Sequence, residues 1–445
     1  MALKAFRCVY TAIKLKLKSK NVKKDHWLDF AVEKHGKELV NELKIVSSIL
    51  FLYIPIPLFW GLFEQIATTW TYQARQMNGE IGDTFTIPPG QIQLSNPIFV
   101  MILIPLFVYV IYPNFANICV FRTALRRITL GGFLVWVSFV ITAFNAMRLE
   151  ENYPALPLES EAQIRIFNVL PCDITIFSRA LNSGRLLNMT KLSLYTQTLY
   201  SVIGTPELNF DMTSSCSSIK GKFTLTEAEA ATYYFKDSNK EPIYIKESVR
   251  ESIGGFINVR IVINLNGKYD EPINITFGDD KNGMTKTNSS SLNFIRFSNP
   301  GIYTIELGNL FKIKQKFSLG GVYSLNAIAV SANQFDVKNL VIAKPNNIHV
   351  LWIIPPYIVI SVGEILFSIT GSAFSYCQTP KNMKTLVLGV WFLTFCIGQL
   401  IVVAVEYIRI FEKASARFFL YAAFMVIDMI LFIAMTMGYK YAEYK

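Results

Sequence analysis

The sequence contains few of the residues on which soluble enzymes depend. Of its 445 residues only 17% are charged and three are histidines, none paired at a metal-ligand spacing, whereas soluble domains carry about 25% charged residues. It also lacks a glycine-rich phosphate loop and a nucleophile elbow. We therefore expect no enzymatic activity, no metal site and no bound cofactor.

Hydrophobic residues, by contrast, make up 52% of the chain and include 34 phenylalanines. The formal charge is +11, and residues 1–45 alone hold 11 Lys/Arg against 5 Asp/Glu. A basic excess beside long apolar runs favours a membrane surface over nucleic acid. The Lys-rich run 14–24 has the composition of a nuclear signal, but attraction to anionic lipid is the simpler explanation. The composition predicts a membrane protein without a nucleic-acid partner.

Six stretches are apolar enough to cross the bilayer, which takes about 20 helical residues. They are Ile45–Trp70, Asn96–Tyr112, Ile128–Met147, Ile348–Tyr376, Met383–Tyr407 and Ala416–Tyr439. They group into two membrane regions, 45–147 and 348–439, flanked by a basic segment at 1–44 and a short tail at 440–445.

Charge asymmetry between the connections predicts the orientation. With a cytoplasmic N-terminus, the second and fourth connections are cytoplasmic too, and they carry a basic excess that includes Arg126, Arg127 and Lys384. This agrees with the positive-inside rule. We expect a multi-pass plasma-membrane protein with both termini in the cytoplasm and residues 148–347 outside.

Residues 148–347 have the pattern of a folded β-domain. Short β-branched and aromatic runs alternate with turn signals, which is typical of one or two β-sandwich lobes. Three N-glycosylation sequons, at Asn188, Asn274 and Asn288, all fall in this segment, as expected of an extracellular domain. Its two cysteines, Cys172 and Cys216, could either form a disulfide there or remain free.

Ionisable residues within spans are functional candidates. Glu364 shares a helical face with Tyr357, Ser361 and Ser368, which suggests a carboxylate that binds a cationic group; a buried glutamate paired for structure is the alternative. Pro355-Pro356 and Gly363 predict a kink or opening nearby, and Gly371 a gap for backbone approach on the same face.

The first span offers a second candidate. Trp60 and Glu64 lie one turn apart on a face with Tyr53, which suits a ligand with apolar and charged parts. An interfacial Trp with a near-interface Glu is almost equally compatible with the pattern. Asp428 in the last span has no polar neighbours at helical spacing, and we expect it to be structural or to snorkel towards the membrane interface.

The motifs of these spans resemble animal proton-coupled oligopeptide transporters of the major facilitator superfamily. The matching segments are His26–Asp29, Phe51–Trp60, Glu64-Gln65, Trp70-Thr71, Gln91–Gln93, Asn96-Pro97, Ile111–Pro113, Gly363–Gly371 and Phe374–Tyr376. The large extracellular domain is also a feature of the animal members. The resemblance implies an α-helical membrane fold: one six-span major-facilitator half, with a β-sandwich-rich extracellular domain inserted between the third and fourth spans.

The resemblance also implies roles for individual residues. Glu364 matches the carboxylate that receives the peptide amino terminus. Trp60 and Trp391 match pocket aromatics, Asn96 a polar group near the peptide backbone, and Phe63 and Glu64 an aromatic–acidic block. The implied ligands are di- and tripeptides, with a proton as the coupling ion.

Only the C-terminal half of such a transporter is matched, so proton-coupling residues of the other half cannot be assigned. Ser48 and Val108 also replace an Arg and an Asp that relatives usually pair. We therefore expect a half that transports peptides with a complementary N-terminal half or a second copy. The alternatives are a non-transporting membrane protein that binds extracellular peptide or protein through its outer domain, and a truncated version of a longer chain.

Overall fold

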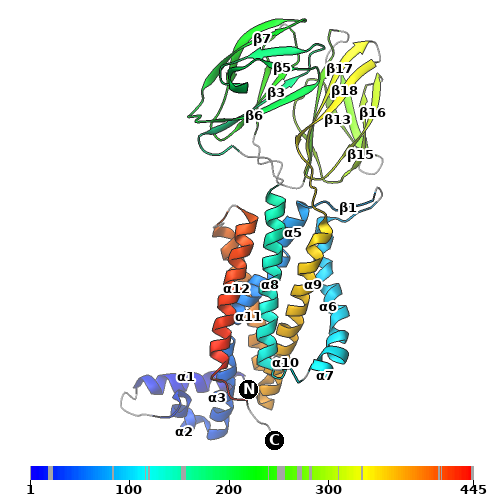
Figure 1. Ribbon diagram of the computed structural model, residues 1–445. Helices are drawn as coiled ribbons and strands as arrows, with labels where there is room; N and C mark the ends of the chain where they lie inside the picture. The colour runs from blue at the N-terminus through cyan, green and yellow to red at the C-terminus, as the bar shows by residue number, and fades with distance from the viewer. Residues whose placement is uncertain are drawn as a thin grey trace. The chain divides into compact units, whose positions relative to one another are not determined.

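The computed structural model forms two compact units (Figure 1). The helical unit comprises Met1–Ala74, Pro88–Glu150 and Val350–Lys445, and the strand unit comprises Arg75–Ile87 and Glu151–His349. The structure describes residues 2–18, 24–82, 85–115, 117–118, 121–151, 157–238, 240–247, 256–267, 273–279, 283–308, 310–331, 334–408, 411 and 413–441.

The helices begin and end as follows. They are α1 Ala2–Lys18, α2 Val32–His35, α3 Lys37–Leu52, α4 Ile56–Phe63, α5 Thr69–Arg75, α6 Ser95–Leu106, α7 Tyr112–Phe115, α8 Ala124–Glu150, α9 Ile354–Glu364, α10 Thr370–Gln378, α11 Lys384–Ile408 and α12 Ala414–Thr436. Two π-helical segments, Phe107–Ile111 and Ile365–Ile369, join α6 to α7 and α9 to α10.

Within the described residues, five helices are long and apolar enough to cross a membrane, namely Pro89–Phe115, Ala124–Glu150, Val350–Gln378, Lys381–Val405 and Ala414–Thr436. A bent pair, Lys37–Leu52 and Ile56–Arg75, meets the same test when its parts are taken together across a 41° bend. Pro55 precedes α4 and Pro57 lies in its first turn. The bend follows from this sequence, because proline cannot continue the hydrogen-bond ladder of the preceding helix.

Glycines bring the helices of this unit into backbone contact. A Cβ on Gly131 of α8 would lie 2.7 Å from the carbonyl oxygen of Gly363, and one on Gly363 would lie 2.8 Å from that of Gly131. Gly61 of α4 and Gly398 of α11 form a similar crossing. A Cβ on Gly61 would lie 2.9 Å from the carbonyl oxygen of Gly398, and one on Gly398 would lie 2.7 Å from that of Pro57. Small residues at such crossings allow membrane helices to pack closely.

The strand unit contains short and long strands. They are β1 Glu80–Ile81, β2 Phe85–Thr86, β3 Glu161–Asn168, β4 Ile174–Phe177, β5 Leu187–Met189, β6 Ser193–Tyr200, β7 Glu207–Ser214, β8 Ser218–Thr224, β9 Ala230–Phe235, β10 Ile243–Glu247, β11 Ile257–Asn264, β12 Asn274–Asp279, β13 Gly283–Asn288, β14 Ile295–Phe297, β15 Gly301–Leu307, β16 Phe311–Phe317, β17 Val322–Ser331 and β18 Gln334–Ala343.

Strands β3–β10 and β11–β18 form two lobes with the same topology. The first lobe has sheets ordered β10-β9-β3-β6 and β5-β4-β7-β8, and the second has β14-β11-β17-β18 and β13-β12-β15-β16. Each strand of the second lobe therefore corresponds to the strand eight positions earlier in the chain. Both lobes contain one parallel pair, β3 with β9 and β11 with β17. Each lobe buries its own apolar core.

Buried charges connect the two lobes. Glu247 at the end of β10 accepts from Arg165 of β3 at 3.0 Å and also pairs with Arg260 of β11, and all three side chains are buried. Arg260 donates to the hydroxyl of Tyr234 at 3.3 Å. Burial raises the pKa of Tyr234, so the phenol stays neutral. A small apolar cluster that includes Val262 and Ile328 packs beside this network.

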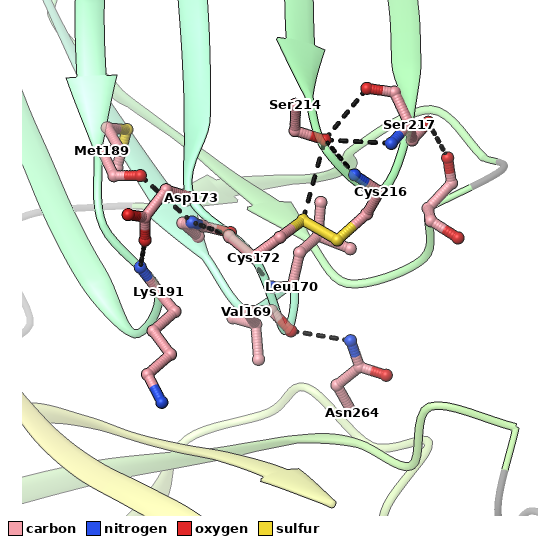
Figure 2. Close-up of a disulfide and its surroundings, with 12 residues drawn as sticks. Val169, Leu170, Cys172, Asp173, Met189, Lys191, Ser214, Cys216, Ser217 and Asn264 are labelled. Carbon is pink, nitrogen blue, oxygen red and sulfur yellow. Dashed lines mark hydrogen bonds between the residues drawn. A yellow bond between two sulfur atoms is a disulfide. The ribbon is translucent and has the colours of Figure 1, made fainter. Parts of the chain in front are cut away.

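The first lobe also contains a disulfide between Cys172 and Cys216, with a Cα–Cα distance of 6.3 Å (Figure 2). Around it, the Ser214 hydroxyl accepts from the backbone N–H groups of Cys216 and Ser217 at 3.2 and 3.0 Å. Nearby, Asn264 of the second lobe donates to the carbonyl of Val169 at 2.7 Å. The bridge thus stands next to contacts that order the loop after β7 and the junction of the lobes.

Candidate functional site

A cluster of polar side chains joins α6 to α9 inside the helical unit. Asn96, in the first turn of α6, donates from Nδ2 to Oε2 of Glu364 at 2.9 Å. Ser361, one turn before Glu364, donates to Oδ1 of Asn96 at 2.6 Å and also lies 2.7 Å from the carbonyl of Tyr357. Within the described residues, the hydrogen-bond donor to the Glu364 carboxylate is therefore a neutral amide, which Ser361 orients.

Glu364 lies at the point where α9 loses its regular geometry. The kink or opening expected near Pro355-Pro356 and Gly363 is found on the Gly363 side, because the two prolines occupy the first turn of α9, where no intrahelical N–H donor is required. The irregular turn follows Glu364 instead, as the π-helical segment Ile365–Ile369. Such π-bulges occur often at functional sites.

The same π-segment changes which residues share a helical face with Glu364. A π-turn adds a residue to the helical repeat. Positions after Glu364 therefore no longer follow the α-helical spacing from which the shared face was expected. Ser368 lies within the segment and is half-buried. Gly371 faces a side chain rather than a backbone, because a Cβ there would lie 2.3 Å from the Trp391 ring. Tyr357, Ser361 and Glu364 precede the segment and keep their common face.

Aromatic rings form a second cluster around Trp60 of α4. Its ring meets Phe367 at 6.2 Å and Trp391 at 6.2 Å, both edge-on. Phe59 stacks on Phe367 at 3.4 Å, and Tyr53 donates to the hydroxyl of Ser375 at 2.5 Å. Trp60 and Trp391 are 6% and 4% exposed, so the two tryptophans expected to line a pocket belong to one buried cluster.

Phe63 and Glu64 connect this cluster to the carboxylate. Phe63 meets Trp60 edge-on at 6.0 Å. Glu64 accepts a hydrogen bond from Gln399 of α11, and its charge interacts with that of Glu364. Sequence reasoning missed Gln399 and Phe367. An amide inside an otherwise apolar helix was an available signal for Gln399, whereas nothing in the pattern distinguishes Phe367 from the other phenylalanines.

Several buried polar atoms near these clusters, Nε1 of Trp70 among them, have no hydrogen-bond partner within the described part of the chain, and two of them belong to the candidate site. They are the hydroxyl of Tyr357 and Nε1 of Trp60. The Tyr357 ring packs edge-on against Trp70 at 4.9 Å. Buried polar groups usually find partners, so these two atoms are available to a polar ligand. Among the described residues, no group of three or more His, Cys, Asp or Glu side chains is placed to hold a metal.

Asp428 of α12 is 2% exposed, and its Oδ2 has no partner among the described groups. It lies on the helix that packs against α8, where Met429 fills the space beside Gly132. No contact in the described structure joins it to the cluster around Glu364.

Of the sequon asparagines in the strand unit, Asn188 and Asn274 are exposed and Asn288 is half-buried. Asn274 and Asn288 are directly paired across β12 and β13. Side chains at directly paired positions have Cβ atoms about 5 Å apart, so glycans on these two residues would compete for the same space.

Comparison with known protein sequences finds relatives over nearly the whole chain. The sequence model of the POT family matches residues 1–223 and 302–440. Solute carrier family 15 member 1 from Rattus norvegicus is 30% identical over 464 residues, covering 98% of this chain and 62% of that protein. Peptide transporter family 1 from Drosophila melanogaster is 26% identical over 444 residues, covering 98% of this chain and 59% of that protein.

A solved structure of the POT family transporter PepTSo has a TM-score of 0.44 and 15% identity, covering 100% of this chain and 55% of that one. The chain thus spans about three fifths of the length of the curated relatives it matches. The relatives are transporters by name, not enzymes.

Proposed function

Because the chain belongs to the POT family, we propose that it takes part in proton-coupled transport of di- and tripeptides across a membrane. In this proposal Glu364 binds the α-amino group of the peptide. The observation that carries the assignment is the Asn96–Glu364–Ser361 cluster, in which an amide and a hydroxyl orient a carboxylate without neutralising its charge. A cationic ligand group would supply the missing opposite charge.

The surrounding groups support a peptide ligand. Trp60, Trp391 and Phe63 offer apolar surface for peptide side chains, and the unpartnered Tyr357 hydroxyl and Trp60 N–H offer polar contacts to a peptide backbone. Asn96 would contribute both by holding Glu364 and by its own amide. Ser368 and Glu64 complete the proposed set at its edge. Apolar walls with a few placed polar groups are typical of ligand sites.

We further propose that the helical unit provides six spans, with the bent pair α3–α5 as the first. It would work with a complementary set of helices, on a partner chain, in a second copy or elsewhere in a longer polypeptide. The residues that couple transport to protons are expected among those helices.

The proposed setting is the plasma membrane, with both termini cytoplasmic and residues 148–347 as an extracellular β-sandwich domain. Asn188 and one of the directly paired asparagines Asn274 and Asn288 would carry glycans there, and the oxidising exterior would maintain the Cys172–Cys216 bridge.

Contact between the N-terminal segment and the bilayer surface is also supported. On α1, Leu3, Phe6 and Leu17 are 66%, 73% and 75% exposed. They recur at helical spacing beside basic residues that include Lys14 and Lys18. An exposed apolar stripe with flanking lysines is typical of a helix that lies on an anionic membrane surface.

Peptide uptake driven by an inward proton gradient tests the proposal. Cells expressing this chain, alone and together with the N-terminal half of a homologous transporter, should accumulate labelled dipeptide in at least one arrangement. Glu364→Gln should reduce dipeptide binding roughly tenfold or more, because truncating one partner of a buried charge pair costs about 2–5 kcal/mol. Asp428→Asn, an isosteric change at a buried acidic side chain on α12, should leave binding unchanged. No uptake in either arrangement, with binding that is insensitive to Glu364→Gln, would instead favour a protein that binds extracellular peptide or protein through residues 148–347.

A further inference from the structure

A cavity lies between α8 and α12 at the end of the helical unit where α8 begins and α12 ends. Its volume is about 720 Å³, within the roughly 300–1,000 Å³ of typical ligand sites. Its lining residues are Thr123, Leu125, Arg126, Thr129, Leu130, Phe133, Ile433, Thr436, Met437, Tyr439 and Tyr441. None belongs to the cluster around Glu364, so the proposed peptide site does not account for this cavity.

The cavity lining on α8 and α12 reaches to within about one turn of a tight contact between these helices. Gly132 of α8 lies against Met429 of α12, whose side chain occupies the space that a Cβ on the glycine would need. Beyond this contact, Thr129 and Phe133 on α8 and Ile433 on α12 line the walls. All three are only half-buried. The inner part of the cavity is therefore apolar and bounded by two helices that each meet the criteria for a membrane span.

The outer part of the cavity is basic and aromatic. Arg126 is its one charged lining residue, and no lining residue is acidic. Tyr439 and Tyr441 close the other side, and both pack on Phe374 of α10, at 5.4 and 6.0 Å. Tyrosine and arginine at the end of a span are typical of the headgroup level, and basic pockets between spanning helices bind lipid headgroups.

We propose that this cavity binds an anionic glycerophospholipid of the surrounding bilayer. The phosphate lies beside Arg126 near the rings of Tyr439 and Tyr441, and an acyl chain runs over Leu130, Phe133 and Ile433. The order of these groups along the helices matches the lipid: a cationic residue near the start of α8, then the apolar side chains of Leu130, Phe133 and Ile433. A soluble phosphate compound would use Arg126 but leave these apolar side chains uncovered.

Native mass spectrometry of the full chain in detergent, titrated with dioleoyl phosphatidylglycerol, tests the proposal. Arg126→Gln should weaken lipid retention about tenfold, as expected for loss of a charge-assisted contact. The matched control Arg122→Gln removes a nearby exposed arginine that does not line the cavity, and it should change retention less than twofold. Equal losses in the two variants would mean general surface attraction and overturn the proposal.

Two further arms identify the ligand and its position. Glycerophosphoglycerol, the headgroup without acyl chains, should not displace the lipid at equal concentration; equal competition would make this a free-phosphate site and contradict the proposal. A phosphatidylglycerol with a diazirine on its acyl chain should label peptides that contain residues 129–133 and 433–437, and Thr129→Trp should abolish this labelling by filling the cavity. Labelling confined to other helices would overturn the proposal even if Arg126→Gln disturbed folding.

Discussion

The strand unit and the helical unit both bury charged side chains, but they give those charges different partners. In the strand unit, Glu247 is held between Arg165 and Arg260, so each buried charge faces an opposite one. In the helical unit, Glu364 meets the amide of Asn96, which is in turn oriented by Ser361. A charge that already has ionic partners stabilises an interface, whereas one held by neutral groups is available to a ligand. Glu247 is buried and Glu364 half-buried, and it is the chemical nature of their partners that indicates the role of each glutamate.

The comparison predicts that the same isosteric change has a large effect on stability in the strand unit and a small one in the helical unit. Glu247→Gln leaves two buried guanidinium groups without their anion, so it should destabilise the strand unit by about 3–5 kcal/mol. Glu364→Gln should change the stability of the helical unit by less than about 1 kcal/mol, because the glutamine oxygen can still accept from Asn96. Hydrogen exchange on the full chain, followed by mass spectrometry, should show faster exchange in β3, β10 and β11 only for the first variant.

Glu229→Gln is the matched control for Glu247. Glu229 pairs with Lys246 at 2.9 Å on the surface, where the two side chains are 33% and 59% exposed. Exposed pairs contribute about 1 kcal/mol or less. Exchange rates that change as much for Glu229→Gln as for Glu247→Gln would remove the distinction on which the comparison depends.

A smaller difference is expected between the two lobes of the strand unit. The first lobe contains the Cys172–Cys216 bridge, which closes a loop with a sequence separation of 44, whereas residues 257–343 contain no cysteine. Replacing both cysteines by serine should cost the first lobe about 2–4 kcal/mol. Hydrogen exchange should become faster in β4 and β7, which lie next to the two cysteines. The exchange rates in the core of the second lobe should change less. Equal effects in both lobes would show that they unfold as one cooperative unit.

The smallest predicted effect concerns His26, before the short helix Trp27–Ala31. Its Nδ1 accepts from the backbone N–H of Leu28 at 3.2 Å. Burial, and then the charge of Lys44, lower the pKa of His26. Because protonation is disfavoured in the folded state, the stability from this cap is present above about pH 6.5 and is lost as the pH falls, by about 1 kcal/mol at most. NMR titration of histidine-labelled protein should give His26 a pKa below 6.5, and His26→Asn should remove the pH dependence. A raised pKa would contradict this account.

Much of the organisation could be predicted from the sequence, because long apolar runs and β-branched runs separated by turn signals are local patterns. The family resemblance, carried by the motifs around Phe51–Trp60 and Gly363–Gly371, is confirmed by the comparisons. The grouping of Glu364, Tyr357 and Ser361 on one face also agrees with the structure, since α9 keeps α-helical geometry up to Glu364.

Other features could not be predicted, for identifiable physical reasons. Helical spacing fails at Ser368 because a π-turn, which has no reliable sequence signal, follows Glu364. The partnership of Glu64 with Gln399 depends on how α4 and α11 cross at Gly61 and Gly398. The ionic network of Arg165, Glu247 and Arg260 joins three strands from two lobes, and no local pattern encodes such a long-range meeting.

The central claim is that Glu364 recognises a cationic amino group through its charge. The most direct test compares binding of a dipeptide with binding of its N-acetylated form, in the unaltered chain and in Glu364→Gln, using the same arrangement of chains that shows uptake. We predict that acetylation weakens binding roughly tenfold or more in the unaltered chain. In Glu364→Gln it should have less than a twofold effect, because the charge that distinguishes the two ligands is gone. An acetylation penalty of the same size in both proteins would show that another group binds the amine and would contradict the assignment.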